Sequence, residues 1–121
     1  MQYMLLIYAP EEYWADRSDE ERAAMSQEYS AVTQEMQNAG AFVAGDALQP
    51  IATATTVRVN AGEALTTDGP FAETKEQLGG YYLLDVESID EALEWAAKLP
   101  AARHGSIEVR PVMNVTAEAQ G

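Results

Sequence analysis

The sequence contains no cysteine, a single histidine and few basic residues, 7 among 121. Without cysteine the chain cannot form a disulfide, a thiolate metal site or a cysteine nucleophile. One histidine and scattered carboxylates do not make the ligand set that a transition metal needs, so we expect no metal and no other cofactor. The missing thiols fit a reducing compartment, and we expect the protein in the cytoplasm.

Basic residues are outnumbered by 20 acidic ones, which gives a formal net charge of −13. Such a field repels phosphate backbones and anionic lipid surfaces and argues against direct binding to nucleic acid or to a membrane. No uncharged apolar stretch approaches the roughly 20 residues of a membrane-spanning helix. The apolar run near the start has no basic leader, so export is not expected. Glycine-rich phosphate loops, nucleotide fingerprints and a Ser-His-Asp order are absent too.

Hydrophobic residues, by contrast, make up 47% of the chain. They are interleaved with charged residues, which is the balance of a globular protein. A chain of this length fits one domain. We expect this domain at residues 1–115 and a frayed C-terminal tail at 116–121, where apolar residues are scarce.

The hydrophobic pattern predicts an α+β fold. Two helices are expected to begin at Ser-x-x-Glu capping boxes, at Ser18 and Ser88, and to end before Gly40 and at Pro100. Strands are predicted where apolar residues are continuous or alternate, at 3–8, 42–44, 55–59, 63–66, 80–86 and 106–110. Residues 41–86 are interpreted as a meander of short strands, interrupted by the polar loop 68–77.

This order of strands and helices is that of a ferredoxin-like unit, an antiparallel sheet with two helices on one face. The strands predicted at 3–8 and 80–86 are apolar on both sides. The sheet face without helices cannot then be left in water. We therefore expect a homodimer, in which a second copy covers that face.

The segment 67–82, TDGPFAETKEQLGGYY, resembles the signature of DGPF proteins, a branch of the YCII-related family. The resemblance continues at 3–8, 45–50, 90–97 and 108–111, so it covers nearly the whole chain. It implies a dimeric α+β barrel of ferredoxin-like protomers. It also implies two kinds of function: YCII-related proteins have been suspected of being enzymes with a paired histidine and aspartate, and some DGPF relatives occur fused to or beside sigma factors.

The histidine–aspartate pair of the family is not transferred to this chain. The resemblance places the histidine on the first helix, but residues 21–36 contain none. It places the aspartate after the second helix, where Leu99-Pro100-Ala101 stands instead. His104 lies in a different context, in a predicted loop, and a capping or surface role is weighed there against catalysis.

Asp68 is the candidate catalytic residue. Gly69 can take a positive φ and Pro70 fixes the backbone, so the Asp68 carboxylate would be held in one direction, as a general base requires. The alternative is that Asp68 closes an Asx-turn by bonding its own backbone.

Four residues are candidate ligand-binding groups, each with a structural alternative: Lys75, Glu76, Tyr81 and Arg110. The loop that holds Lys75 and Glu76 is either a lid or a solvated loop whose glycines start the next strand through a bulge. Tyr81 and Tyr82 must point to opposite sheet faces, so one phenol can reach a ligand while the other packs in the core. Arg110, preferred to Arg58 because the resemblance includes it, either orients a carboxylate ligand or forms an ordinary ion pair.

Two functional hypotheses follow. In the first, the protein binds a small ligand in a cleft near the DGPF loop and is an enzyme of unknown reaction, with Asp68 as base. In the second, it is a non-enzymatic interaction module whose acidic surface steers it toward a sigma-factor-type partner in transcription initiation. The sequence does not decide between an enzyme and a binding module.

Overall fold

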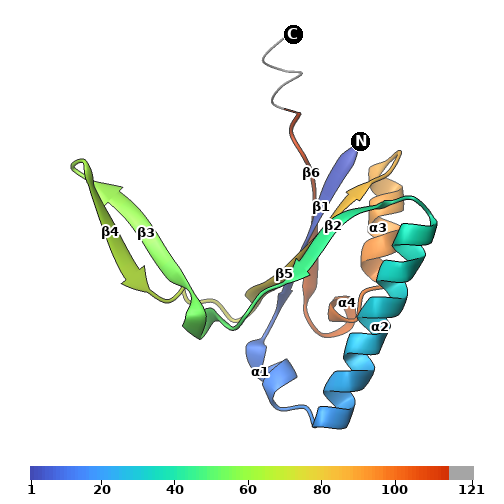
Figure 1. Cartoon of the computed structure of the whole chain (residues 1–121), viewed down its shortest axis with the longest axis horizontal. Helices are drawn as coiled ribbons and strands as arrows, with labels where there is room; N and C mark the ends of the chain where they lie inside the picture. The colour runs from blue at the N-terminus through green and yellow to red at the C-terminus, as the bar shows by residue number, and fades with distance from the viewer. Residues whose placement is uncertain (115–121) are drawn as a thin grey trace.

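Four strands form one antiparallel sheet in the computed structural model, which describes residues 1–114. Their order across the sheet is β2 (Phe42–Ala47), β5 (Gln77–Asp85), β1 (Gln2–Ala9) and β6 (Ser106–Pro111). Helices α2 (Asp19–Asn38) and α3 (Ile89–Ala97) cover one face (Figure 1). The predicted ferredoxin-like α+β fold is confirmed, whereas the predicted tail at 116–121 lies outside the described residues.

Three short helical segments complete the fold, and the sequence analysis did not predict them. They are α1 (Glu11–Ala15), the single 3-10 turn η1 (Ile51–Thr53) and α4 (Ala101–His104). The expectation that His104 lies in a loop was therefore wrong, because the chain makes one more helical turn after Pro100, which leads α4. No helix in the described part of the chain is long and apolar enough to cross a membrane.

The start of α2 is fixed by the predicted capping box. The Ser18 hydroxyl accepts a hydrogen bond from the Glu21 backbone N–H, and the Glu21 carboxylate accepts one from the Ser18 N–H, both at 3.1 Å. Hydrogen bonding from Ser18 to the charged carboxylate, that of its backbone N–H first, lowers the pKa of Glu21. Of the capping box predicted at Ser88, α3 shows one half, in which the Ser88 hydroxyl accepts from the Glu91 N–H. Both helices begin where they were predicted to begin.

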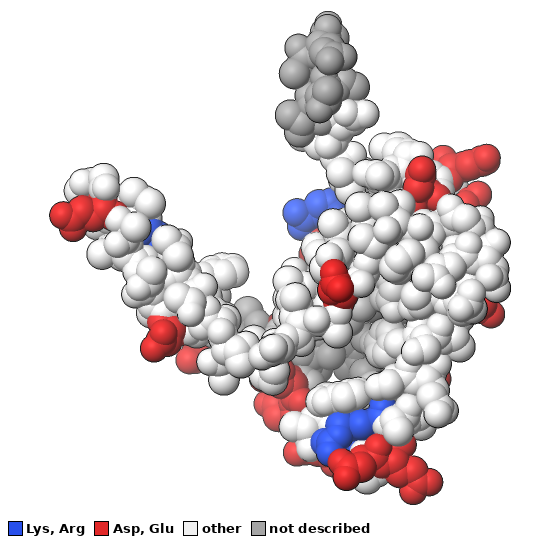
Figure 2. Space-filling model, viewed as in Figure 1, with Lys and Arg blue, Asp and Glu red and all other residues white. Residues whose placement is uncertain are grey.

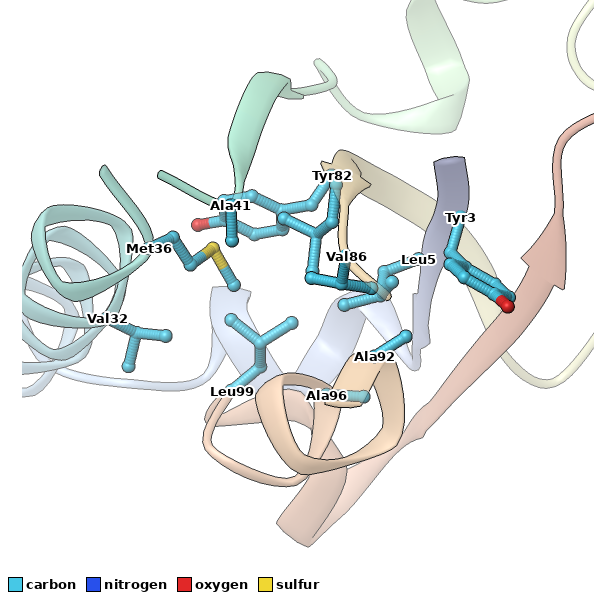
Figure 3. Close-up of a cluster of buried hydrophobic side chains, with 11 residues drawn as sticks. Tyr3, Leu5, Val32, Met36, Ala41, Tyr82, Val86, Ala92, Ala96 and Leu99 are labelled. Atoms are coloured by element: carbon cyan, nitrogen blue, oxygen red, sulfur yellow. The ribbon is translucent and has the colours of Figure 1, made fainter. Parts of the chain in front are cut away.

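The core fills the space between the sheet and the two long helices. Leu5 of β1, Met36 of α2 and Leu99, which follows α3, lie in this space (Figure 3), and Leu84 of β5 belongs to the same cluster. All four side chains are fully buried. The core excludes water from the helix-covered face, and its apolar burial supplies most of the favourable free energy of folding.

Strands β3 (Thr55–Asn60) and β4 (Glu63–Asp68) do not join this sheet, so the predicted meander was wrong. They form a separate two-stranded hairpin, called the arm below, which stands away from the rest of the subunit (Figure 1). Ala61 and Gly62, both with positive φ, close its tight turn. The turn pairs β3 with β4, and β2 pairs directly with β5.

The sheet face opposite α2 and α3 is called the open face. It carries the half-buried side chains of Met4, Leu6 and Leu83, which alternate with core residues along β1 and β5. The open face agrees with the predicted two-sided apolar pattern of the central strands. That a second copy covers it stays a prediction.

Candidate functional site

A cavity of about 650 Å³, called the end cavity below, lies where β2 ends and β5 begins. It is bounded by α1, α2, α4 and the β2–η1 connection. Its volume lies within the range of small-molecule sites, about 300–1,000 Å³. The lining is rich in aromatic side chains, namely Tyr13, Trp14, Tyr29, Phe42, Tyr81 and Tyr82.

Helix α1 closes one side of the end cavity because two side chains hold it in place. The Glu11 backbone N–H donates a hydrogen bond to Gln77 Oε1 at 3.0 Å. The Ile51 N–H donates to Glu11 Oε1 at 2.6 Å. The first bond links α1 to the start of β5 and the second links it to η1. The wall is therefore joined to the sheet and to the β2–η1 connection by polar contacts.

His104 lies against α1 at the cavity wall. Its ring stacks on that of Tyr13, with centroids 3.6 Å apart and planes inclined by 20°. On Tyr13 also lies the Arg17 guanidinium, 4.7 Å from the ring centroid. Burial first, and then the positive charges of Arg103 and Arg17, lower the pKa of His104. At neutral pH the imidazole is therefore uncharged, and it can accept a hydrogen bond or a proton.

Two tyrosine hydroxyls are fixed by hydrogen bonds beside the cavity. The Thr33 hydroxyl donates to the Tyr29 carbonyl at 2.8 Å, so it accepts from the Tyr82 hydroxyl, also at 2.8 Å. The Tyr29 hydroxyl accepts from the Ala101 N–H at 3.2 Å. Burial raises the pKa of Tyr29, which keeps this phenol protonated. Both phenols are thus held in fixed orientations on the cavity wall.

We expect the His104 imidazole to titrate below its ordinary pKa of 6.5. Because its neutral form is favoured in the folded chain, its contribution to stability is complete above that value and is lost as the pH falls through the lowered pKa. A pH titration of the histidine resonances by NMR measures this directly, since the chain has a single histidine.

Two charge changes serve as controls for this titration. Arg103→Gln should raise the pKa of His104, and Glu76→Gln should lower it further, because Arg103 disfavours and Glu76 favours the protonated ring. An imidazole that titrates at or above 6.5 would contradict the half-buried position against Tyr13.

Asp68, Lys75 and Arg110 do not meet at the end cavity. Asp68 ends β4 at the base of the arm with an exposed side chain, and Lys75 is exposed in the following segment. Arg110 lies on the open face in an ion pair with Glu108. None of the three lines the end cavity among the described residues. A catalytic role for Asp68, and ligand binding by Lys75 and Arg110, stay predictions.

Glu76 and Tyr81 lie closer to the end cavity. The Glu76 carboxylate accepts a hydrogen bond from the Ser106 hydroxyl at 2.7 Å and is near enough to His104 to affect its charge. Tyr81 lines the cavity and donates to Asp46 Oδ2 at 2.7 Å, which raises the pKa of this phenol. The side chain of Tyr82 is buried on the helix-covered face of the sheet, opposite to that of Tyr81, as the alternation along the strand predicted.

The segment around Lys75 and Glu76 ends in a β-bulge, as one of the two alternatives proposed. Ile7 pairs with Gly80 and Tyr8 with Leu78, so Gly79 is the extra residue in β5. The carbonyl of Gly79 accepts a hydrogen bond from the Leu48 N–H at 2.8 Å. The bulge joins the start of β5 to the β2–η1 connection and shapes the cavity wall.

No cluster of metal-ligating side chains is found within residues 1–114. Four residues of the cavity wall were not selected from the sequence, namely Glu11, Tyr13, Tyr29 and His104. The aromatic residues close together near the start, at 8, 13 and 14, could have indicated this wall of the cavity.

Comparison with known proteins gives a family but no activity. The family model described as the YCII-related domain matches residues 1–116. The chain is 44% identical over 114 residues to an uncharacterised protein of Rhizobium meliloti (strain 1021), a match that covers 93% of this chain and 92% of the relative. Membership of the DGPF branch stays a prediction.

Proposed function

The chain belongs to the YCII-related family, and from this starting point we propose that it binds a small, uncharged, flat molecule in the end cavity. The observation that carries the proposal is the cavity itself, about 650 Å³ with an aromatic lining and a small number of fixed polar groups. Such a combination of apolar walls and oriented polar groups is typical of small-molecule sites.

The charge of the lining favours an uncharged ligand over an anion. Glu11 and Asp46 supply carboxylates to it, and no Lys or Arg is among the lining residues that the structure describes. The lowered pKa of His104 keeps its imidazole uncharged at neutral pH, and the Arg17 guanidinium is engaged with the Tyr13 ring. A ligand carboxylate would therefore meet negative charge without a compensating cation in the lining itself.

The polar groups indicate how the ligand is oriented. We infer that the neutral His104 imidazole accepts a hydrogen bond from a ligand N–H or O–H, while the aromatic rings of Tyr13 and Trp14 bury the flat body. This arrangement supports binding. A reaction at the same place is compatible with it, because a neutral imidazole is also a suitable proton acceptor.

The test uses Trp14 as a reporter, with 2-naphthamide and 2-naphthoate as matched probes. The chain has two tryptophans, so Trp95→Phe leaves Trp14 as the sole fluorophore of this kind. We expect 2-naphthamide to quench Trp14 saturably and 2-naphthoate to bind at least about tenfold more weakly, since the lining offers the carboxylate no Lys or Arg. Equal affinity for the two probes, or no saturable quenching by either, would contradict the proposal.

Two serines one helical turn apart on α2 provide matched variants. Both are exposed on α2, but only Ser26 lines the end cavity. Ser26→Phe should fill part of the cavity and weaken naphthamide binding by about tenfold or more, while Ser30→Phe leaves it unchanged. Asp68→Asn in the same assay tests the predicted role of Asp68. Because Asp68 does not line the end cavity, this variant should bind 2-naphthamide as the wild type does unless Asp68 has that role.

The interaction module remains the alternative. No contact among the described residues selects a sigma-factor-type partner, and the acidic surface is its main support. A pull-down with the intact protein that recovers no transcription protein would count against it.

A further inference from the structure

One tyrosine hydroxyl on the wall of the end cavity is fixed in place and still keeps its proton for a ligand. Hydrogen bonds fix three phenols there, and two of them, Tyr81 and Tyr82, donate their protons to neighbouring side chains. The Tyr29 hydroxyl instead accepts from the Ala101 N–H at 3.2 Å. It donates to no group in the described part of the chain, so its O–H is available to a molecule bound in the cavity.

His104 lies one helical turn from this hydroxyl. The bond to Ala101 places the Tyr29 hydroxyl at the first residue of α4, and His104 is the last residue of the same turn. Side chains on a helix lean toward its N-terminus, so the imidazole leans toward the hydroxyl. Three residues of helix rise about 4.5 Å, which leaves room for two adjacent groups of one ligand. Both side chains line the end cavity.

The surroundings of these two groups move their pKa values in opposite directions. Burial raises the pKa of Tyr29, so this phenol stays a donor. Burial first, and then Arg103 and Arg17, lower the pKa of His104, so the imidazole stays a base. Opposed pKa changes within one cavity are typical of an acid–base pair. The Glu76 carboxylate favours the protonated ring, so it stabilises the imidazolium after the base has taken a proton.

The chemistry of the cavity favours a carbonyl compound. Figure 2 shows a hollow between α1 and α2 whose inner surface is mostly uncharged. A fixed hydroxyl donor suits a carbonyl oxygen, and a neutral base suits a hydrogen on the adjacent carbon, which the carbonyl group makes acidic. An apolar wall strengthens the hydrogen bond to the oxygen as negative charge develops there.

We infer, building on the proposed binding function, that the end cavity catalyses the enolisation of an uncharged, flat carbonyl compound, with His104 as base and Tyr29 as donor to the carbonyl oxygen. The imidazole removes a proton from the carbon next to the carbonyl group. The C–H electron pair forms the new C=C bond, and the C=O π pair moves onto the oxygen, which the Tyr29 O–H stabilises. The imidazolium then returns a proton to the same carbon, or to another carbon of a conjugated enolate, which moves a double bond.

Deuterium exchange of 2-tetralone gives the direct test. This bicyclic ketone is flat and uncharged, like 2-naphthamide, and it carries two hydrogens on the carbon between its aromatic ring and its carbonyl group. In D₂O each deuteron returned by the imidazolium replaces one of these hydrogens, and proton NMR measures the loss. We expect the wild-type protein to exchange them saturably, at least about hundredfold faster than buffer, as general base catalysis does.

Three substitutions separate the base, the donor and a phenol outside the cavity. His104→Gln should reduce exchange to the buffer rate. Tyr29→Phe should lower kcat at least about tenfold, because the enolate oxygen loses its donor. It should still bind 2-naphthamide, as quenching of Trp14 shows. Tyr3→Phe is the control, since the Tyr3 hydroxyl bonds the Met1 sulfur and does not line the end cavity. Its kcat should change less than about threefold.

The pH dependence of kcat identifies the base. The groups that face His104 are Tyr13 and Arg17 from the side of α1, Arg103 on α4 and Glu76 before β5. Because Arg103 and Arg17 disfavour the protonated ring, kcat should rise with a midpoint below 6.5 and be level at neutral pH. A midpoint at or above 6.5 would contradict a neutral His104 as the base.

The outcomes separate this inference from the binding proposal. A protein that binds 2-naphthamide but exchanges 2-tetralone at the buffer rate would overturn enolisation and leave the binding proposal standing. Exchange that is unchanged in His104→Gln or in Tyr29→Phe would overturn the acid–base pair in the same way. A protein that neither binds 2-naphthamide nor exchanges 2-tetralone would contradict both proposals.

Discussion

Leu99→Ala is expected to lower the free energy of unfolding by about 2–5 kcal/mol, the range for truncating a fully buried leucine. Leu99 is 0% exposed and follows α3, where its backbone N–H still bonds the Ala96 carbonyl. Figure 3 shows its side chain pointing into the space between the two long helices, toward Val32 and Met36. The neighbouring Pro100 and the start of α4 limit how far the chain can collapse into the cavity left behind.

The matched control is Leu93→Ala on α3, where the leucine side chain is 48% exposed. The same atoms are removed there, but they leave no cavity, and the loss should be below about 1 kcal/mol. Urea unfolding of the two variants, with equal m-values, measures the difference. Similar losses in both would mean that Leu99 is not buried in the core while Leu93 is exposed, as the structure describes.

The predicted parts of the fold are those that depend on local signals. The capping box at Ser18 fixes the start of α2 through bonds between residues three apart, so the sequence carries the full information. The apolar runs of β1 and β5 predicted central strands, because residues buried on both faces leave no polar alternation. The positive φ of Gly69 was likewise expected from its residue type.

The arm was misjudged because period-two alternation is the same in a sheet and in a free hairpin. Val57 and Val59 alternate with polar residues as they would in a meander. The arm is separate from the sheet because β2 pairs with β5 instead of with β3. In that pairing β2 lies beside Leu83 and Leu84, which are about forty residues further along the chain. Pairing between distant segments leaves no mark in the local pattern.

The end cavity was not predicted because its walls come from five separated segments. His104 meets Tyr13 across about ninety positions of sequence, through α4, a helix of 4 residues with no capping side chain. Asp68 was predicted as a candidate because the turn residues that fix its backbone are its neighbours in sequence. The lesson for this chain is that a conspicuous loop motif and an enclosed site need not coincide in one subunit.

Gly105→Ala is expected to cost about 1–3 kcal/mol of stability, as overpacking against a rigid neighbour does. The φ of Gly105 is −146°, an extended value that alanine also adopts, so the expected loss does not come from the backbone conformation. A Cβ there would lie 3.0 Å from Ala9 Cα and closer still to the Tyr8 carbonyl oxygen. Both contacts are with the backbone of β1, which is held between β5 and β6 and cannot move aside.

Gly79→Ala is the matched control, because a Cβ at Gly79 would meet no atom within 4 Å. This variant should stay within about 0.5 kcal/mol of the wild type. Because Gly105 follows His104 directly, the shift that relieves the clash should also move the imidazole off Tyr13. We therefore expect Gly105→Ala to weaken naphthamide quenching of Trp14 as well. A Gly105→Ala protein that is less stable but binds the probe normally would show that the position of His104 does not depend on this close approach to β1.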